Sequence, residues 1–333
     1  MIHLSLPEHG TRRLPFFLAM EEWAARALDA ADYFFAWRVA PTVICGRNQD
    51  IAAEVDLDYC RREGIAVVRR RSGGGAVYAD MNNWMFSYIT PSEEVQTTFA
   101  RYTTMVAGML RGLGVAAQAN GRNDIVVEGR KISGNAFYHL PGRSIAHGTM
   151  LHSIDSERLA HALTPSRAKL AGKGVRSVPM RVTSLTEQGL AMSVEDFGEY
   201  AVGQLTESTY TLTAADISAI EEIEQKYYRP EWLKTQAPSV SPDIHTTTER
   251  FEGVGEISAR YRLDDRGAIA AFELSGDFFV LGDVGHLICR PLTGLSASDR
   301  SAGRLPEGVD ASRAIAGMKN EHLISLIQKL RMQ

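Results

Sequence analysis

Apolar side chains recur at the 3.6-residue period of a helix in six stretches of the chain. In the first, Glu21 and Glu22 fall between apolar positions, so we expect an amphipathic helix packed against a core. Asp56 and Ser156 open two of the others and are candidate N-caps. The expected helices span residues 16–28, 56–63, 97–113, 156–163, 194–205 and 214–228.

Shorter apolar or alternating runs between these helices are typical of strands. Gly46–Gln49 forms a polar turn after one such run, and a ligand site or a plain hairpin loop fits it equally well. Glu128–Arg130 is expected to be the tight turn between two others. The expected strands span residues 33–39, 42–45, 65–68, 83–89, 120–127, 131–137 and 145–151.

The pattern stops in residues 234–248, which are polar, contain two prolines and have no period, so we expect a linker there. It then restarts with two strand-like runs and two helical runs, at residues 251–263, 268–274, 284–289 and 321–331. We therefore expect two domains, a catalytic one over residues 1–245 and a small α+β accessory one over residues 246–333.

Composition narrows the possible functions. The chain has 333 residues and a net charge of −4, which argues against general nucleic-acid binding. No apolar run approaches the roughly 20 residues that a membrane span needs, and we expect no signal peptide. Cys45, Cys60 and Cys289 are scattered and form no C-x-x-C pair, so we expect a cytoplasmic protein without a structural zinc site, and we assign no metal-binding residues.

The densest polar chemistry lies in residues 67–87. Arg69–Arg71 precede Ser72 and the consecutive glycines Gly73–Gly75. Glycines leave main-chain N–H groups open to a ligand, and guanidinium groups bind phosphate or carboxylate through paired hydrogen bonds. The segment therefore predicts an anion site on a strand–glycine loop–strand unit, although a flexible hairpin with solvated arginines fits the spacing equally well. It matches neither a Walker loop nor a dinucleotide fingerprint.

Three further features carry candidate chemistry. Lys131 directly follows a tight turn, where its amine could project into a cleft, although a lone lysine there is more often solvated. His147 begins a strand and would also suit a structural role. Residues 168–182 carry lysines and arginines among glycines, which favours a loop that closes over an anion.

Taken together and in order, these motifs resemble the lipoate–protein ligase family over about residues 15–190. Residues 276–279, Gly-Asp-Phe-Phe, are similar to part of the small accessory domain of that family. The motifs that carry the resemblance lie at residues 69–78, 121–124, 130–136, 147–151, 173–178 and 181–185.

The resemblance implies an α+β fold shared with biotin–protein ligases and class II aminoacyl-tRNA synthetase cores, built on a mixed β-sheet. It implies that ATP with Mg²⁺ activates lipoate, or octanoate, to an acyl-adenylate. A lysine of an apo lipoyl domain then takes the acyl group. The acceptors would be E2 subunits of 2-oxoacid dehydrogenases or the H protein of glycine cleavage. Separately from the resemblance, we expect the protein to be a monomer.

The resemblance also assigns roles to residues of this chain. Lys131 is the implied catalytic residue, since its ammonium would contact both phosphate and lipoyl carbonyl oxygen. A closing loop over residues 169–185 would shield the adenylate, and Trp37, Val43 and Phe137 are candidate walls of the lipoyl slot. The implied ATP and lipoyl-adenylate site comprises Arg70, Gly73, Gly74, Gly75, Ala76, Val77, Tyr78, Asn83, Asn123, Asp124, Lys131, His147 and Gly148.

Two departures from the family pattern stand out. The family often has His-Asp-x-Gly-Asn after the glycine loop, where this chain has Ala79–Asn83, and Pro179 replaces a frequent basic residue. The alternative function is a lipoyl or octanoyl transferase that uses a pre-activated acyl donor. A thioester route is disfavoured because no cysteine lies just before His147, and a non-catalytic lipoate-binding protein is disfavoured by Lys131 together with Arg70.

Overall fold

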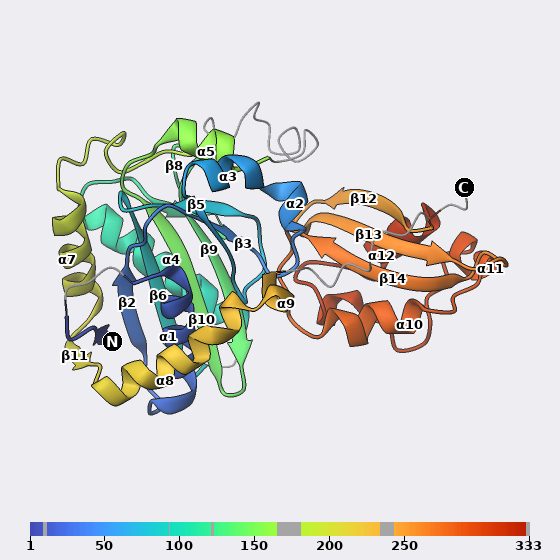
Figure 1. The fold of residues 1–333 in the computed structure, drawn as a ribbon, viewed down its shortest axis with the longest axis horizontal. Helices are drawn as coiled ribbons and strands as arrows, with labels where there is room; N and C mark the ends of the chain where they lie inside the picture. The colour runs from blue at the N-terminus through green and yellow to red at the C-terminus, as the bar shows by residue number, and fades with distance from the viewer. Residues whose placement is uncertain (9–11, 93, 121–122, 165–180, 234–242, 331–333) are drawn as a thin grey trace.

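The computed structural model describes residues 1–8, 12–92, 94–120, 123–164, 181–233 and 243–330. Two lobes lie side by side in Figure 1, an N-terminal lobe that ends at residue 233 and a C-terminal lobe built from residues 243–330. Within these ranges, no helix is both long and apolar enough to cross a membrane.

A mixed β-sheet forms the centre of the N-terminal lobe. Its strands are β1 (Ile2–Ser5), β2 (Tyr33–Trp37), β6 (Asn83–Thr90), β7 (Gln118–Ala119), β8 (Asp124–Val127), β9 (Arg130–Leu140), β10 (Arg143–Leu151) and β11 (Ser208–Thr211). They are ordered β11-β1-β2-β6-β10-β9-β8-β7. β1 runs parallel to both of its neighbours, and the other pairs are antiparallel.

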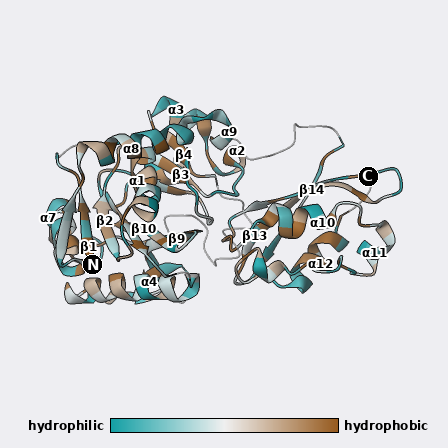
Figure 2. Ribbon diagram, turned by 90° about the horizontal axis from the view of Figure 1, so that it is seen from below, coloured by the Kyte–Doolittle hydropathy of each residue, from teal (hydrophilic) through white to brown (hydrophobic). Residues whose placement is uncertain are grey.

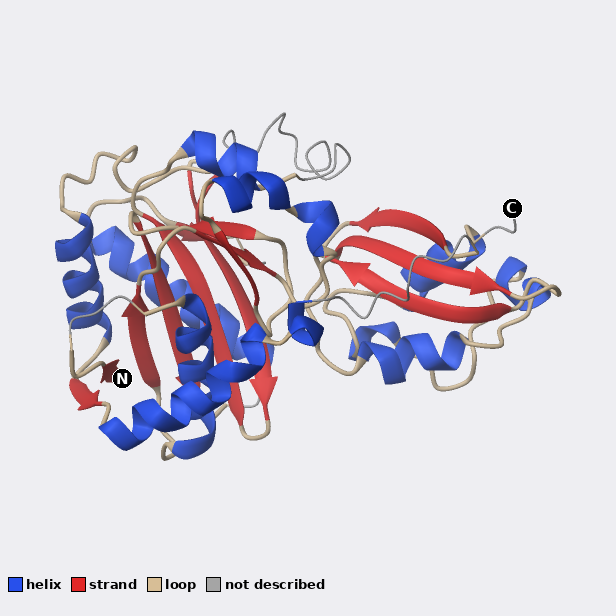
Figure 3. Ribbon diagram, viewed as in Figure 1, coloured by secondary structure: helices blue, strands red, loops and turns tan. Residues whose placement is uncertain are grey.

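Helices cover both faces of this sheet because its strands are apolar on both sides. Phe35 packs into one core with helices α1 (Leu14–Ala27) and α8 (Ala214–Glu224). Phe34, one residue earlier and so on the opposite face, packs into a second core with α4 (Val95–Gly112) and α7 (Val194–Leu205). Figure 2 shows α4 below the strands and α1 and α8 above them, and Figure 3 shows the helices and strands of both lobes in the view of Figure 1.

A second, smaller sheet holds the glycine segment. It comprises β4 (Ala66–Arg69), β3 (Thr42–Cys45) and β5 (Val77–Ala79), with β3 parallel to β4 and antiparallel to β5. The glycine loop joins the two outer strands. The strand expected after the loop, residues 83–89, instead belongs to β6 of the large sheet, and sequence analysis missed β5. Short helices α2 (Ile51–Glu54), α3 (Leu57–Arg62) and α5 (Ser156–Ala162) flank this sheet.

The C-terminal lobe has its own sheet and core. Its antiparallel strands are β12 (His245–Phe251), β13 (Gly255–Leu263) and β14 (Ile269–Gly276). Its helical segments are η3 (Gly285–Cys289), α10 (Arg290–Leu292), α11 (Ala297–Ser301), η4 (Ala311–Arg313) and α12 (Asn320–Gln328). The expected linker was too long, because residues 245–248 already pair in β12; residues 234–242 lie outside the described part.

The ends of the helices test the N-cap residues and the helix bounds that were predicted from the sequence. The N-cap prediction for Asp56 is confirmed, since its carboxylate accepts a hydrogen bond from the Tyr59 N–H at 2.8 Å. The prediction for Ser156 is wrong by one residue, because Asp155 caps α5 through the Arg158 N–H. The helix expected over 214–228 ends as α8 at Glu224 and continues as the 3₁₀ helix η2 (Gln225–Tyr228), before α9 (Pro230–Leu233).

Candidate active site

One cavity gathers most of the residues that the sequence singled out. Its walls come from β3, β9, β10, the glycine loop and the C-terminal lobe. The predicted residues that line it are Arg70, Gly74, Gly75, Ala76, Val77, Asn123, Lys131, His147 and Gly148. Gly73, Tyr78, Asn83 and Asp124 are not among its lining residues.

Lys131 stands at the start of β9 and forms a cluster with two other charged side chains. Its Nζ lies 2.8 Å from Asp124 Oδ1, and Arg181 lies 2.6 Å from Asp124 Oδ2. Asp124 comes from the neighbouring strand β8, so the hairpin itself brings the two together. The chain after residue 180 returns beside Lys131, where the Thr183 N–H donates to the Lys131 carbonyl at 2.8 Å. Residues 165–180, most of the predicted closing loop, lie outside the described part.

The environment of Lys131 lowers the pKa of its amine. Burial is the main cause, because it disfavours the charged form, and the nearby guanidinium of Arg181 acts in the same direction. The carboxylate of Asp124 opposes the shift and keeps the ammonium in place. A partly buried cation held by a carboxylate is suited to stabilise negative charge that develops on a substrate.

A glycine makes room for this lysine. A Cβ on Gly134 would lie 2.2 Å from Lys131 Nζ and 2.3 Å from its Cε, so only glycine leaves the lysine its observed path. Gly148 on the adjacent strand is equally confined, since a Cβ there would lie 1.8 Å from Asn135 Oδ1. The two glycines explain why small residues recur where β9 and β10 meet the cavity.

Arg70 supports the glycine loop from within. Its Nη2 donates to the carbonyls of Gly73 and Gly75 at 2.6 and 2.9 Å, and its Nη1 donates to the Ile44 carbonyl. Its Nε donates to the Ser72 hydroxyl at 2.9 Å. Burial lowers the pKa of the Arg70 guanidinium to about 10, which leaves it charged at neutral pH. We expected a guanidinium facing an anion, but these donors are directed at the loop.

His147 continues this polar chain to helix α1. Ser72 Oγ, which accepts from Arg70, also lies within hydrogen-bond distance of His147 Nε2, at 2.7 Å. The other ring nitrogen, Nδ1, carries the proton and donates to the Glu21 carboxylate at 2.8 Å. Glu21 is fully buried and also accepts from Ser87 Oγ at 2.6 Å. His147 therefore touches the cavity while it is held in one orientation.

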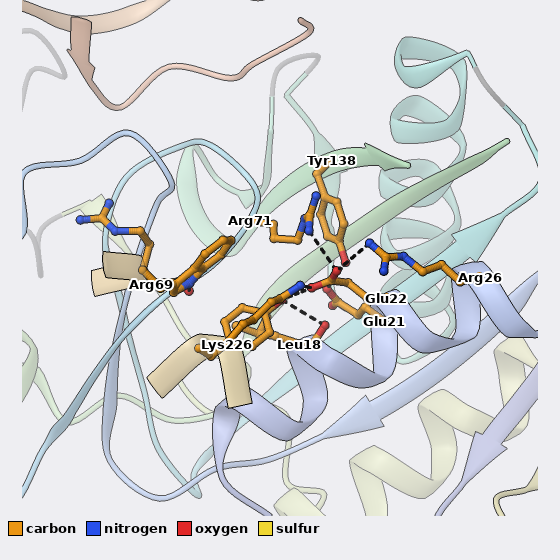
Figure 4. Close-up of polar contacts among 10 residues, drawn as sticks. Leu18, Glu21, Glu22, Arg26, Arg69, Arg71, Tyr138 and Lys226 are labelled. Carbon is orange, nitrogen blue, oxygen red and sulfur yellow. Dashed lines mark hydrogen bonds and ion pairs between the residues drawn. The ribbon is translucent and has the colours of Figure 1, made fainter. Parts of the chain in front are cut away.

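Glu22, the next residue of α1, anchors the arginine segment in the same way (Figure 4). Its carboxylate, also fully buried, pairs with Arg71 at 2.9 Å and with Lys226. It accepts a third hydrogen bond from the hydroxyl of Tyr227 at 2.6 Å. Helical periodicity could not identify these roles, since it places Glu21 and Glu22 on a polar face, whereas in the folded protein η2 packs on Glu22 and strands β6 and β10 pack on Glu21.

Apolar side chains form one part of the cavity wall: Leu18, Trp37, Ile44, Met85 and Ala136. Trp37 was expected there. Val43 does not line the cavity, because strand alternation turns it into another core and directs Ile44 inward. Phe137 stacks on Phe279 of the C-terminal lobe, with ring centroids 5.3 Å apart, and Phe279 itself lines the cavity.

The C-terminal lobe also fits closely against the glycine loop. The Gly74 N–H donates to the Phe278 carbonyl at 3.0 Å, and a Cβ on Gly73 would lie 2.3 Å from that oxygen. Gly74 has φ +88°, a conformation that favours glycine. The consecutive glycines therefore permit close contact with the neighbouring lobe, in addition to leaving Gly74, Gly75 and Ala76 at the cavity.

Solved structures share this fold. LipL1 of P. falciparum, in complex with lipoate, aligns with a TM-score of 0.67 at 20% identity, covering 83% of this chain and 84% of the other. The bi-partite lipoate protein ligase of Thermoplasma acidophilum, described with its E2 lipoyl domain, gives 0.61 at 28% identity over 71% and 98%. Lipoate-protein ligase A bound with ATP gives 0.59 at 26% over 70% and 98%. The molecule thus has the α+β, class II synthetase-like fold of lipoate ligases, as the sequence predicted.

Sequence comparison identifies the family. The model of the lipoyl protein ligase A/B catalytic domain matches residues 15–206. Lipoate-protein ligase LplJ of Bacillus subtilis is 33% identical, covering 93% of this chain and 95% of the relative. Lipoate–protein ligase 1 of Staphylococcus aureus is 35% identical, covering 81% and 83%. The chain belongs to the lipoate–protein ligase family, and it is an enzyme of that kind.

Proposed function

We propose that this enzyme uses ATP to activate lipoate, or octanoate, as an acyl-adenylate and then transfers the acyl group to a lysine of a lipoyl domain. The observation that carries the proposal is one cavity in which Lys131, the glycine loop and an apolar wall meet. Lipoate and ATP are each bound by a related structure, which supports both substrates.

In the first step, an oxygen of the lipoate carboxylate attacks the α-phosphorus of ATP. The bond from that phosphorus to the bridging oxygen breaks, and pyrophosphate leaves with the electron pair. Lys131, oriented by Asp124, stabilises the negative charge on the α-phosphate. The main chain of residues 74–77, with Asn123, His147 and Gly148, completes the proposed binding site, and Arg70 contributes by holding the loop.

In the second step, the neutral ε-amine of the acceptor lysine attacks the acyl carbon. The bond from that carbon to the phosphate oxygen breaks, AMP leaves, and the proton of the amine passes to solvent. Lys131 then faces the carbonyl oxygen on which charge develops. The apolar wall that includes Trp37 and Met85 takes the alkyl chain, and each buried methylene contributes about 0.8 kcal/mol.

We propose E2 subunits or the glycine cleavage H protein as acceptors, and a monomeric enzyme with a catalytic domain over residues 1–245 and an accessory domain over 246–333. The Thermoplasma ligase is described together with an E2 lipoyl domain, which supports the first acceptor. All three cysteines are buried free thiols, as a reducing cytoplasm allows.

Mg²⁺ would accompany ATP. It typically binds through phosphate oxygens, water and one or two carboxylates. Glu54 and Asp277 line the cavity, and the described residues contain no group of three or more potential metal ligands. The two carboxylates therefore fit an ion that arrives with the nucleotide and neutralises phosphate charge.

The decisive assay measures pyrophosphate release and acyl transfer to an apo lipoyl domain, with lipoate and octanoate compared. We expect wild-type protein to do both and Lys131→Ala to be slower by about 10²–10³ in each half-reaction. Lys329→Ala is a matched control, because that lysine pairs with Glu249 in the C-terminal lobe. A wild-type rate in Lys131→Ala would remove the catalytic assignment, and activity only with an acyl carrier protein donor would indicate a transferase.

A further inference from the structure

The C-terminal lobe contributes charged side chains to the cavity, Arg250 from β12 and Asp277 after β14. Neighbouring residues of a strand point to opposite faces, and Phe251 packs into the core of the C-terminal lobe. Arg250 therefore points out of that core, toward the N-terminal lobe. Nothing in the sequence motifs singled it out.

The cationic side chains that line the cavity differ in what already binds them. Arg70 donates to loop carbonyls and to Ser72, while Lys131 and Arg181 share Asp124. Arg250 Nη1 is buried and, within the described part of the chain, has no hydrogen-bond partner. A buried, charged donor without an acceptor is unfavourable, so this atom needs an acceptor that enters the cavity.

Other contacts hold the two lobes together, so Arg250 is not required to stabilise the interface between them. Gly276 N–H donates to the Asn48 carbonyl at 2.9 Å, and Arg260 of β13 lies 3.8 Å from Asp50. Phe279 stacks on Phe137. The acceptor must be anionic to suit a guanidinium, and of the substrates proposed above the phosphate chain of ATP carries the most negative charge.

We propose that Arg250 is a phosphate ligand that the C-terminal lobe supplies to the nucleotide bound in the N-terminal lobe. The inference rests on the proposed use of ATP. It means that the site for nucleotide is complete only when both lobes are in the arrangement described here. Arg250 thus couples docking of the C-terminal lobe to nucleotide binding.

The test is calorimetric titration of the full chain with ATP and with AMP, both in Mg²⁺, for wild type, Arg250→Ala and Arg250→Lys. We expect Arg250→Ala to weaken ATP binding at least tenfold, because the charged hydrogen bonds from its guanidinium to phosphate are lost. Arg250→Lys should be intermediate, because it keeps the charge without the planar fork. Arg260→Ala, at the same lobe contact but outside the cavity, should bind within twofold of wild type.

Each possible result of the titrations either supports or overturns the proposal. A loss for ATP alone places the contact on the β- or γ-phosphate, and a loss for both nucleotides places it on the α-phosphate; either supports the proposal. Unchanged binding in Arg250→Ala, or an equal loss in Arg260→Ala, overturns it. If wild type binds ATP but releases no pyrophosphate with lipoate, the ligase proposal fails while the Arg250 comparison still stands, and absence of ATP binding by wild type ends both.

Discussion

Two charged clusters meet at this cavity, and they differ in how fully their members are bonded. Around helix α1, the buried carboxylates of Glu21 and Glu22 each hold several partners, which reach His147 and Arg71. Around the β8–β9 hairpin, Lys131 and Arg181 share the single carboxylate of Asp124. The first cluster fixes the position of the glycine loop, and the second leaves charge available to a substrate.

This difference in bonding separates residues that hold the structure in place from residues that can act on a substrate, a distinction that the sequence alone does not show. Arg70 and Lys131 both line the cavity, yet Arg70 has four donors directed at the protein, whereas Lys131 has one ion-pair partner among the residues that the structure describes. Substitutions in the α1 cluster should therefore reduce stability first. Substitutions in the hairpin cluster should reduce activity first, with little change in stability.

The largest test of this contrast is Glu22→Ala. It leaves Arg71 and Lys226 without their carboxylate, and breaking a buried ion pair typically costs 3–5 kcal/mol. Both partners keep some contact with solvent, so we expect the free energy of unfolding to fall by about 3 kcal/mol. Urea denaturation measures it. Asp58→Ala, which removes an exposed pair with Arg61, is the control and should lose far less. Equal losses would mean that the α1 cluster is not a scaffold.

The next test moves Lys131 without changing it. In Gly134→Ala the new Cβ would lie 2.2 Å from Nζ, so the flexible end of the lysine must shift away from Asp124. A displacement of this size costs about 10²-fold in rate, while the fold itself should remain stable. Pyrophosphate release and thermal unfolding give the two readouts. Gly203→Ala, in helix α7 where a Cβ meets nothing within 4 Å, should leave the rate unchanged and raise stability slightly, because alanine favours a helix. A normal rate in Gly134→Ala would contradict the assigned position.

The two clusters also differ in how far the sequence predicted them. Consecutive motifs in the family order placed Lys131, Asp124 and the glycine loop, because each lies in or beside a local turn. The roles of Glu21 and Glu22 could not be predicted, since their partners lie as far away as His147 and Lys226 and only tertiary packing buries them. Arg250 was missed for the same reason, as its position depends on how a second lobe docks.

Most elements were likewise predicted from local periodicity, and the errors lie where distant segments pair. Strand β1 was not expected because its neighbours, including β11 near residue 210, are remote in sequence. The short strand β5, which follows the glycine loop, pairs with β3, and its three residues are too few to show an alternating pattern. Val43 and Ile44 show that a one-residue error in strand register exchanges a core residue for a cavity residue.

A smaller effect should appear in the pH dependence of the first half-reaction. Burial lowers the pKa of Lys131, so raising the pH through that value removes its charge, and pyrophosphate release should fall tenfold per pH unit beyond it. The decline should begin below pH 10.5, the usual value for lysine. In Lys131→Arg any residual activity should lack this decline, because a guanidinium stays charged.

Stability should respond in the opposite sense. Between the lowered pKa and about 10.5 the unfolded chain binds more protons at Lys131 than the folded one, so this residue's contribution to the free energy of unfolding rises with pH. If activity and stability fell together as the pH rises, general unfolding, and not deprotonation of Lys131, would explain the loss of activity.

The last prediction concerns the cysteine thiols, for which we expect no reaction in the native enzyme. All three cysteines lie in packed cores, and burial raises the pKa of Cys45 to about 11 and that of Cys289 to about 12. At pH 8 only about one Cys45 in a thousand would be ionised. Iodoacetamide at pH 8 should therefore neither label nor inactivate the native enzyme, whereas denatured protein should react at all three. Rapid labelling of one thiol with loss of acyl transfer would reopen the thioester route and make that buried cysteine a candidate nucleophile.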